Sequence, residues 1–90
     1  MKEYLHAHGR ASMCSIVGKA VASVQHIEFS LVEGHSLLQS QLGLDSLSLY
    51  HVLNSIHDET GILLEPLVAA KLRTVDDLVD ALLGASGAAA

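Results

Sequence analysis

The chain has 90 residues, a length that fits one domain with one modest hydrophobic core. Half of its residues are hydrophobic, yet it has one Phe, two Tyr and no Trp, which predicts a core of aliphatic side chains. Ten acidic residues against five basic ones give a formal charge of −5, which argues against nucleic-acid binding because such binding needs a basic face.

The single cysteine and the hydropathy pattern indicate where the protein works. Cys14 cannot form a disulfide within the chain, which favours a reducing compartment, and we expect it to be a packed or half-exposed side chain. No apolar run approaches the ~20 residues that span a bilayer, and residues 1–6 lack the apolar segment of a signal peptide. We therefore expect a soluble cytoplasmic protein without membrane contact.

The N-terminal part of the chain divides into an extension and a first helix. Residues 1–11 mix charges, two histidines and a glycine without a period, which predicts a weakly attached extension. From residue 12 onward apolar side chains recur at helical spacing, which predicts a helix over 12–25 that Ser12 caps. Its buried stripe is predicted to consist of Met13, Ile16, Val17, Ala20, Val21 and Val24.

A long connection, residues 26–44, follows the first helix. Structureless connections of this length are uncommon in compact domains, so we expect apolar side chains to hold it against the core. These side chains are predicted to be Ile27, Leu31, Val32, Leu38 and Leu42. A short helical turn over residues 37–41 is expected, and two short helices in place of the loop are the alternative.

A polar motif opens the second predicted helix, which should run from Ser46 to about Thr60 and end at Gly61. Gly43 permits a turn before it, and Asp45 and Ser46 are residue types that cap helix N-termini. The buried stripe of this helix is predicted to consist of Leu49, Val52, Leu53 and Ile56. A phosphate on the exposed Ser46 would meet unpaired N–H groups and the positive end of the helix dipole.

Two shorter helical patterns complete the chain. Pro66 suits a first helical position, which predicts a third helix over 66–71, whereas the apolar run 62–64 is too short to predict a strand. The third helix is expected to pack Leu67, Ala70 and Leu72 inward. Thr74 should cap a fourth helix that has Asp76 and Asp77 in its first turn and stops at Gly84, the start of a flexible tail over 84–90. The fourth buried stripe is predicted to be Val75, Leu78, Val79, Leu82 and Leu83.

The expected fold class is therefore all-α, a small four-helix bundle with a long loop between helices one and two and a short third helix. Residues 43–47, Gly-Leu-Asp-Ser-Leu, match the G-x-D-S-L attachment motif, and over residues 12–83 the chain resembles the acyl carrier protein family. This resemblance implies that Ser46 carries a phosphopantetheine arm, taken from coenzyme A and attached through a phosphodiester. It further implies a carrier of acyl thioesters that catalyses no reaction itself.

The resemblance also implies the partners. A phosphopantetheinyl transferase would load the arm, with Asp45 helping it to place metal and phosphate, and acyl-loading, condensing or acyl-transfer enzymes would dock on the monomeric carrier. The recognition residues are expected to be Asp45, Leu47, Tyr50, His51 and Asn54. Since His51, Asn54 and His57 stand where fatty-acid carriers commonly have acids, a dedicated fatty-acid- or polyketide-type pathway is favoured.

Three other functions were weighed against this hypothesis. An aminoacyl or peptidyl carrier stays open, because some aminoacyl carriers also have an Asp-Ser pair. A helical adaptor that is never modified is the second alternative, with Leu47 and Tyr50 binding a partner helix. A hydrolase is disfavoured because His51 lies too far round the helix from Ser46 to act as its base, and the chain has no G-x-S-x-G motif.

A metal site is also disfavoured, although the chain has six histidines. His6 and His8 could bind a metal, but His51 and His57 lie on different sides of the predicted helix. No Cys, Asp or Glu grouping completes a tetrahedral ligand set, so we expect no native metal.

Overall fold

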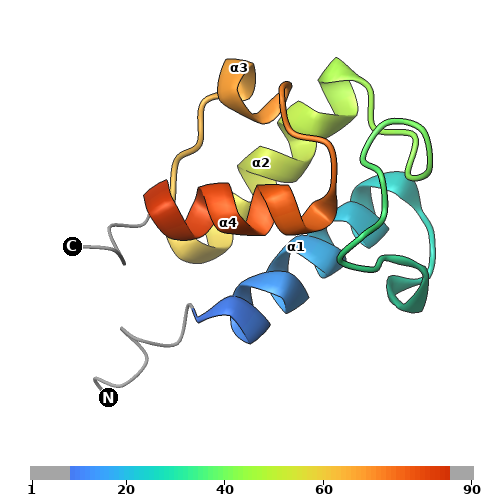
Figure 1. The fold of residues 1–90 in the computed structure, drawn as a ribbon, viewed down its shortest axis with the longest axis horizontal. Helices are drawn as coiled ribbons and strands as arrows, with labels where there is room; N and C mark the ends of the chain where they lie inside the picture. Colours follow the sequence, from blue (N-terminus) through green and yellow to red (C-terminus); the bar gives the residue numbers. More distant parts are fainter. Residues whose placement is uncertain (1–8, 86–90) are drawn as a thin grey trace.

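Four α-helices make up the fold in the part of the chain that the computed structural model describes, residues 9–85 (Figure 1). They are α1 (Arg10–Gln25), α2 (Ser46–Thr60), α3 (Pro66–Ala69) and α4 (Val75–Ala85), with a 3₁₀ turn η2 (Phe29–Leu31) between α1 and α2. α1 packs against both α2 and α4, while the short α3 contacts α2. The predicted all-α bundle, with its long loop and short third helix, is confirmed.

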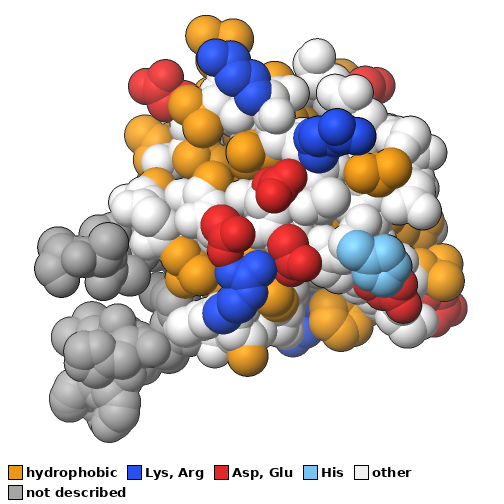
Figure 2. Space-filling model, viewed as in Figure 1, with side chains coloured by type: hydrophobic (Ala, Val, Ile, Leu, Met, Phe, Trp, Pro, Cys, Tyr) orange, Lys and Arg blue, Asp and Glu red, His pale blue; other side chains and the backbone are white. Residues whose placement is uncertain are grey.

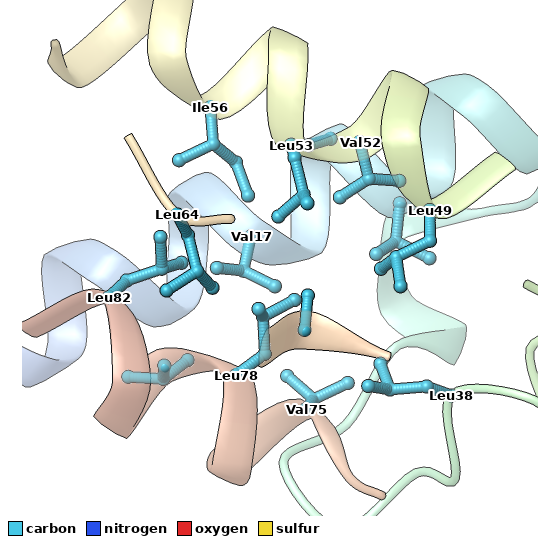
Figure 3. Close-up of a cluster of buried hydrophobic side chains, with 14 of the residues drawn as sticks. Val17, Leu38, Leu49, Val52, Leu53, Ile56, Leu64, Val75, Leu78 and Leu82 are labelled. Carbon is cyan, nitrogen blue, oxygen red and sulfur yellow. The ribbon is translucent and has the colours of Figure 1, made fainter. Parts of the chain in front are cut away.

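The core is aliphatic and draws on the three long helices, on the α1–α2 connection and on residues around α3 (Figure 3). α2 buries all four predicted residues, Leu49, Val52, Leu53 and Ile56. The other buried residues of the predicted stripes are Met13, Val17, Ala20 and Val21 of α1 and Val75, Leu78, Val79 and Leu82 of α4. The remaining predicted residues, Ile16, Val24 and Leu83, are only partly buried at the edge of this core.

α1 begins two residues earlier than the sequence predicted, and its cap is different. Gly9 occupies the N-cap position without a side-chain hydrogen bond, and Ser12 lies exposed inside the helix. The prediction that Ser12 caps α1 is therefore wrong. Arg10 opens the helix, and its guanidinium pairs with Asp76 at 3.2 Å and also with Asp80, which ties the first turn of α1 to α4. Residues 1–8 of the predicted extension lie outside the described residues.

The α1–α2 connection is held down mostly as predicted. Leu38 and Leu42 are buried, and Ile27 and Val32 pack half-buried against the core. Leu31 is 61% exposed, so its predicted burial is wrong. Leu31 lies in η2, a turn that the sequence did not predict and that has no buried residue.

This connection forms two hydrogen-bonded turns, and not the two short helices that were the alternative prediction. The ring of Phe29, in η2, lies so close to Gly18 of α1 that a Cβ atom on residue 18 would be 2.6 Å from this ring. Residues 37–41 form a turn in which the Gln41 N–H donates to the Leu37 carbonyl at 3.1 Å. The predicted turn at this position therefore forms, although it does not extend into an α-helix.

α3 is shorter than predicted and buries a different side chain. It starts at Pro66 as expected but ends at Ala69, whose side chain is 1% exposed. Leu67 is 77% exposed and Ala70 is also exposed, so their predicted packing is wrong, whereas Leu72 packs half-buried against the core. Of the four residues of this helix, only Ala69 is buried.

The predicted cap of α4 is confirmed. The Thr74 hydroxyl accepts the Asp77 N–H at 3.1 Å, and the Asp77 carboxylate accepts the N–H groups of Thr74 and Arg73, each at 3.2 Å. These backbone N–H donors lower the pKa of Asp77, and the N–H of Thr74 has the largest effect. The helix continues through Gly84 to Ala85, one residue beyond the predicted stop, and residues 86–90 of the predicted tail lie outside the described residues.

Candidate functional site

The segment that leads to the polar motif is fixed from two sides. Gly43 has a φ of 69°, in the left-handed region that glycine adopts without strain. The Gln25 side chain of α1 donates to the Leu42 carbonyl at 2.8 Å, and the Leu44 N–H donates to the Leu38 carbonyl at 2.9 Å. Leu44 is itself buried. These contacts hold the first residue of α2 in place relative to α1.

Asp45 is the N-cap residue of α2. Its carboxylate accepts the Ser48 N–H at 2.8 Å, and its carbonyl accepts the Leu49 N–H at 2.9 Å. The Ser48 N–H is the main cause that lowers the pKa of Asp45, so the cap is ionised at neutral pH. Of the two residues that the sequence offered as caps, only Asp45 caps the helix.

Ser46 is the first residue of α2, and its side chain is exposed. Within residues 9–85, neither its hydroxyl nor its N–H has a hydrogen-bond partner. A phosphate bound to this hydroxyl would lie at the positive end of a 15-residue helix, beside a free N–H donor. The adjacent Asp45 carboxylate would repel a free anion, so the site suits a phosphate held by a covalent bond.

The outer face of α2 continues from this serine. Leu47 is 65% exposed and Tyr50 is 49% exposed. His51 and Asn54 are exposed as well, and the ring centroids of Tyr50 and His51 are 6.4 Å apart. The structure thus places four predicted recognition residues on the outside of one helix, and Asp45 at its start. In the described part of the chain, no hydrogen bond joins Ser46 to a histidine.

An apolar cavity of about 320 Å³ lies between α2 and the segment that leads into α3. It is lined by Tyr50, Leu53, Asn54, Leu63, Leu64, Glu65 and Pro66. None of residues 63–66 was predicted from the sequence to belong to a site. The signal in the sequence was the apolar run 62–64, in which the structure buries Ile62 and Leu64 and leaves Leu63 72% exposed.

Two further observations concern metals and membranes. Residues 9–85 contain no group of three His, Cys, Asp or Glu side chains placed to hold a metal ion. His6 and His8, which the sequence analysis considered as metal ligands, lie outside the described residues. Over the same part of the chain, no helix combines the length and the apolar character needed to cross a membrane.

The fold and the exposed serine at a helix start are those of a small helical domain suited to covalent attachment of a phosphate group. The model of the phosphopantetheine attachment site family matches residues 10–82, so the chain belongs to this family. Its members carry phosphopantetheine covalently on a serine, and the chain is accordingly a phosphopantetheine-carrying carrier protein. Such carrier domains are generally non-catalytic and interact with enzymes that modify them and handle acyl groups. No curated protein matches the chain significantly.

Proposed function

We propose that Ser46 carries the phosphopantetheine arm and that this protein presents acyl thioesters to partner enzymes in a dedicated fatty-acid- or polyketide-type pathway. The proposal rests above all on the exposure of Ser46 at the first position of α2, inside the segment that the family matches. The attached arm would supply a terminal thiol that holds the acyl group. The protein itself would catalyse nothing.

The residues around Ser46 support loading by a transferase. Asp45 fixes the start of α2, so the serine hydroxyl projects into solvent at a defined place. Its carboxylate, ionised at neutral pH, is available to help a phosphopantetheinyl transferase place a metal ion beside the phosphate of coenzyme A. The N–H groups of the first turn then favour the phosphodiester that is formed.

The exposed apolar residues of α2 support docking of partner enzymes. Leu47 and Tyr50 together offer a small apolar patch, and such a patch is consistent with a complex that must dissociate after each transfer. His51 and Asn54, beside it, are polar side chains without a carboxylate. We propose this surface as the recognition face of a monomeric, cytoplasmic carrier.

The cavity beside α2 supports an acyl cargo over an aminoacyl cargo. Its volume of about 320 Å³ is at the lower end of the range of ligand pockets, and most of its lining side chains are apolar or aromatic. An aliphatic chain would gain free energy by leaving water there, whereas a charged amino group would lose its hydration. An aminoacyl or peptidyl carrier is the alternative, and comparing the transfer of acyl and aminoacyl groups to the modified protein distinguishes the two.

The test is coexpression with a phosphopantetheinyl transferase followed by intact-protein mass spectrometry. Wild type and the matched control Ser48→Ala should each gain one arm, and Ser46→Ala should gain none. Because Asp45 rather than Ser46 caps α2, Ser46→Ala should change the free energy of unfolding by no more than about 0.5 kcal/mol, so unfolding cannot explain the loss. Modification of the Ser46→Ala variant would assign the arm to another serine, and an unmodified wild type would favour the adaptor hypothesis.

A further inference from the structure

A second cleft lies on another part of the surface and differs from the apolar cavity in its chemistry. It has a volume of about 240 Å³ and lies between the turn before the motif and the α3–α4 connection. Its lining residues are Leu37, Gln39, Ser40, Ala70, Lys71, Leu72 and Arg73. Two of these seven are cationic in a chain whose formal charge is −5.

The two cations are not used by the fold. Within residues 9–85, neither Lys71 nor Arg73 forms an ion pair, whereas Arg10 pairs with two carboxylates of α4. The charge of Arg73 lowers the pKa of Asp77 in small part, after the hydrogen bonds that this carboxylate accepts. Figure 2 shows the contrast on this face, where basic side chains lie over α3 and the α3–α4 connection while acids gather over α4.

The opposite wall of the cleft offers backbone donors. The N–H groups of Gln39 and Ser40 have no acceptor in the described part of the chain, although their neighbours Leu37 and Leu38 donate at 2.7 and 2.8 Å. The position of this wall is fixed, because the Leu38 N–H donates to the Arg73 carbonyl. Two cations and two N–H donors without an acceptor therefore belong to residues that line one cleft.

We propose that this cleft binds the phosphate or carboxylate group of a small organic anion. An anionic group would receive charge-assisted hydrogen bonds from Lys71 and Arg73, and these are about twice as strong as neutral ones. A volume of about 240 Å³ holds such a group with part of its organic moiety, but it is below the size of a whole ligand pocket. Coenzyme A would supply the phosphate, and a carried acyl group that ends in a carboxylate would supply the alternative anion.

The test is an NMR titration of the unmodified protein, labelled with ¹⁵N, and it does not require the proposed function to be correct. The probes are inorganic phosphate, coenzyme A and acetate, each compared with sodium chloride at equal ionic strength. We expect saturable amide shifts at Gln39, Ser40, Lys71 and Arg73 with phosphate, with acetate or with both. The relative affinities of coenzyme A and acetate identify the source of the anion.

Matched variants decide whether the cleft is the site. The double variant Lys71→Ala/Arg73→Ala should weaken binding by about tenfold or more, while Lys19→Ala, an exposed lysine of α1, should leave it unchanged. Both cations are exposed, and the hydrogen bonds of Arg73 to Leu38 and Asp77 use its backbone, so the double variant should keep its circular dichroism spectrum.

Three results with the small anions would overturn the proposal. They are shifts no larger than those with chloride, shifts centred on residues 46–48 at the start of α2, and binding that the double variant retains. A glutamate-rich synthetic peptide serves as the last probe. Saturation by the peptide alone, without binding of the small anions, would assign the cleft to an acidic partner protein and would also refute the proposal.

Discussion

Truncation of Ile56 tests whether α2 turns the face we describe toward the core. Ile56 has no exposed surface, and Figure 3 shows it pointing into the cluster beside Leu53 and Leu64. Deleting a buried isoleucine to alanine costs about 2–5 kcal/mol, and the cost rises with the volume of the void that remains. Because Ile56 is fully buried, Ile56→Ala would leave a closed void. We therefore expect its cost in the free energy of unfolding to fall in the upper half of that range.

The same reasoning gives a lower cost at a neighbouring position of α2. Leu53 is 7% exposed and lines the cavity beside α3, so Leu53→Ala would enlarge an existing space instead of creating a closed void. We expect the lower half of the same range, about 2–3.5 kcal/mol. Tyr50, which is 49% exposed, should cost less than about 1 kcal/mol when changed to alanine. The predicted order of destabilisation is therefore Ile56, then Leu53, then Tyr50.

The measurement is urea denaturation followed by far-ultraviolet circular dichroism, with linear extrapolation of the free energy of unfolding. A chain of 90 residues has a stability of about 4–14 kcal/mol, so Ile56→Ala can approach complete unfolding. Ile56→Val, expected to cost about 0.5–1.5 kcal/mol, keeps the comparison measurable in that case. If Tyr50→Ala destabilises the protein more than Ile56→Val and Leu53→Ala, the register of α2 is wrong and the assigned docking face is wrong with it.

Two further predictions concern the cap and the docking face of α2. Because the Ser48 N–H lowers the pKa of Asp45 below its ordinary value of 3.8, the ionised cap stabilises the fold above that pH and loses this contribution as the pH falls through the folded-state pKa. The difference in Tm between wild type and Asp45→Asn should therefore shrink as the pH falls below about 4, and a difference that stays constant into acid would contradict this. Leu47→Ala should weaken binding to a cognate partner enzyme more than His51→Ala does, because Leu47 would be buried in the complex. Isothermal titration at low and physiological salt should show little change in affinity, and a steep salt dependence would return the docking role to the acidic residues.

Local patterns were sufficient to predict the three long helices and the place of Ser46 at the start of α2. The spacing of Leu49, Val52 and Ile56 predicted the buried face of α2, because side chains three and four residues apart share one face of a helix. Thr74 predicted the cap of α4 for a similar reason, since a cap involves only residues within one turn. The position of Ser46 directly after Asp45 likewise required no tertiary information.

Contacts between distant segments decided what the sequence analysis missed. α1 starts at Arg10, whose guanidinium pairs with a carboxylate 70 residues later in the chain, and no local pattern contains that partner. Ala69 is buried and Leu67 is exposed because α3 packs against α2, and this contact decides which side of α3 faces the core. All four residues of α3 are apolar, so its sequence alone does not distinguish a buried side. The cleft between residues 37–40 and 70–73 likewise forms only because the fold brings two distant segments together. The sequence by itself determined the three long helices and most of their buried residues, through interactions within a few residues, and it placed Ser46 at the start of α2. Only the tertiary structure decided which surfaces stay exposed, because burial depends on the neighbours that the fold brings together.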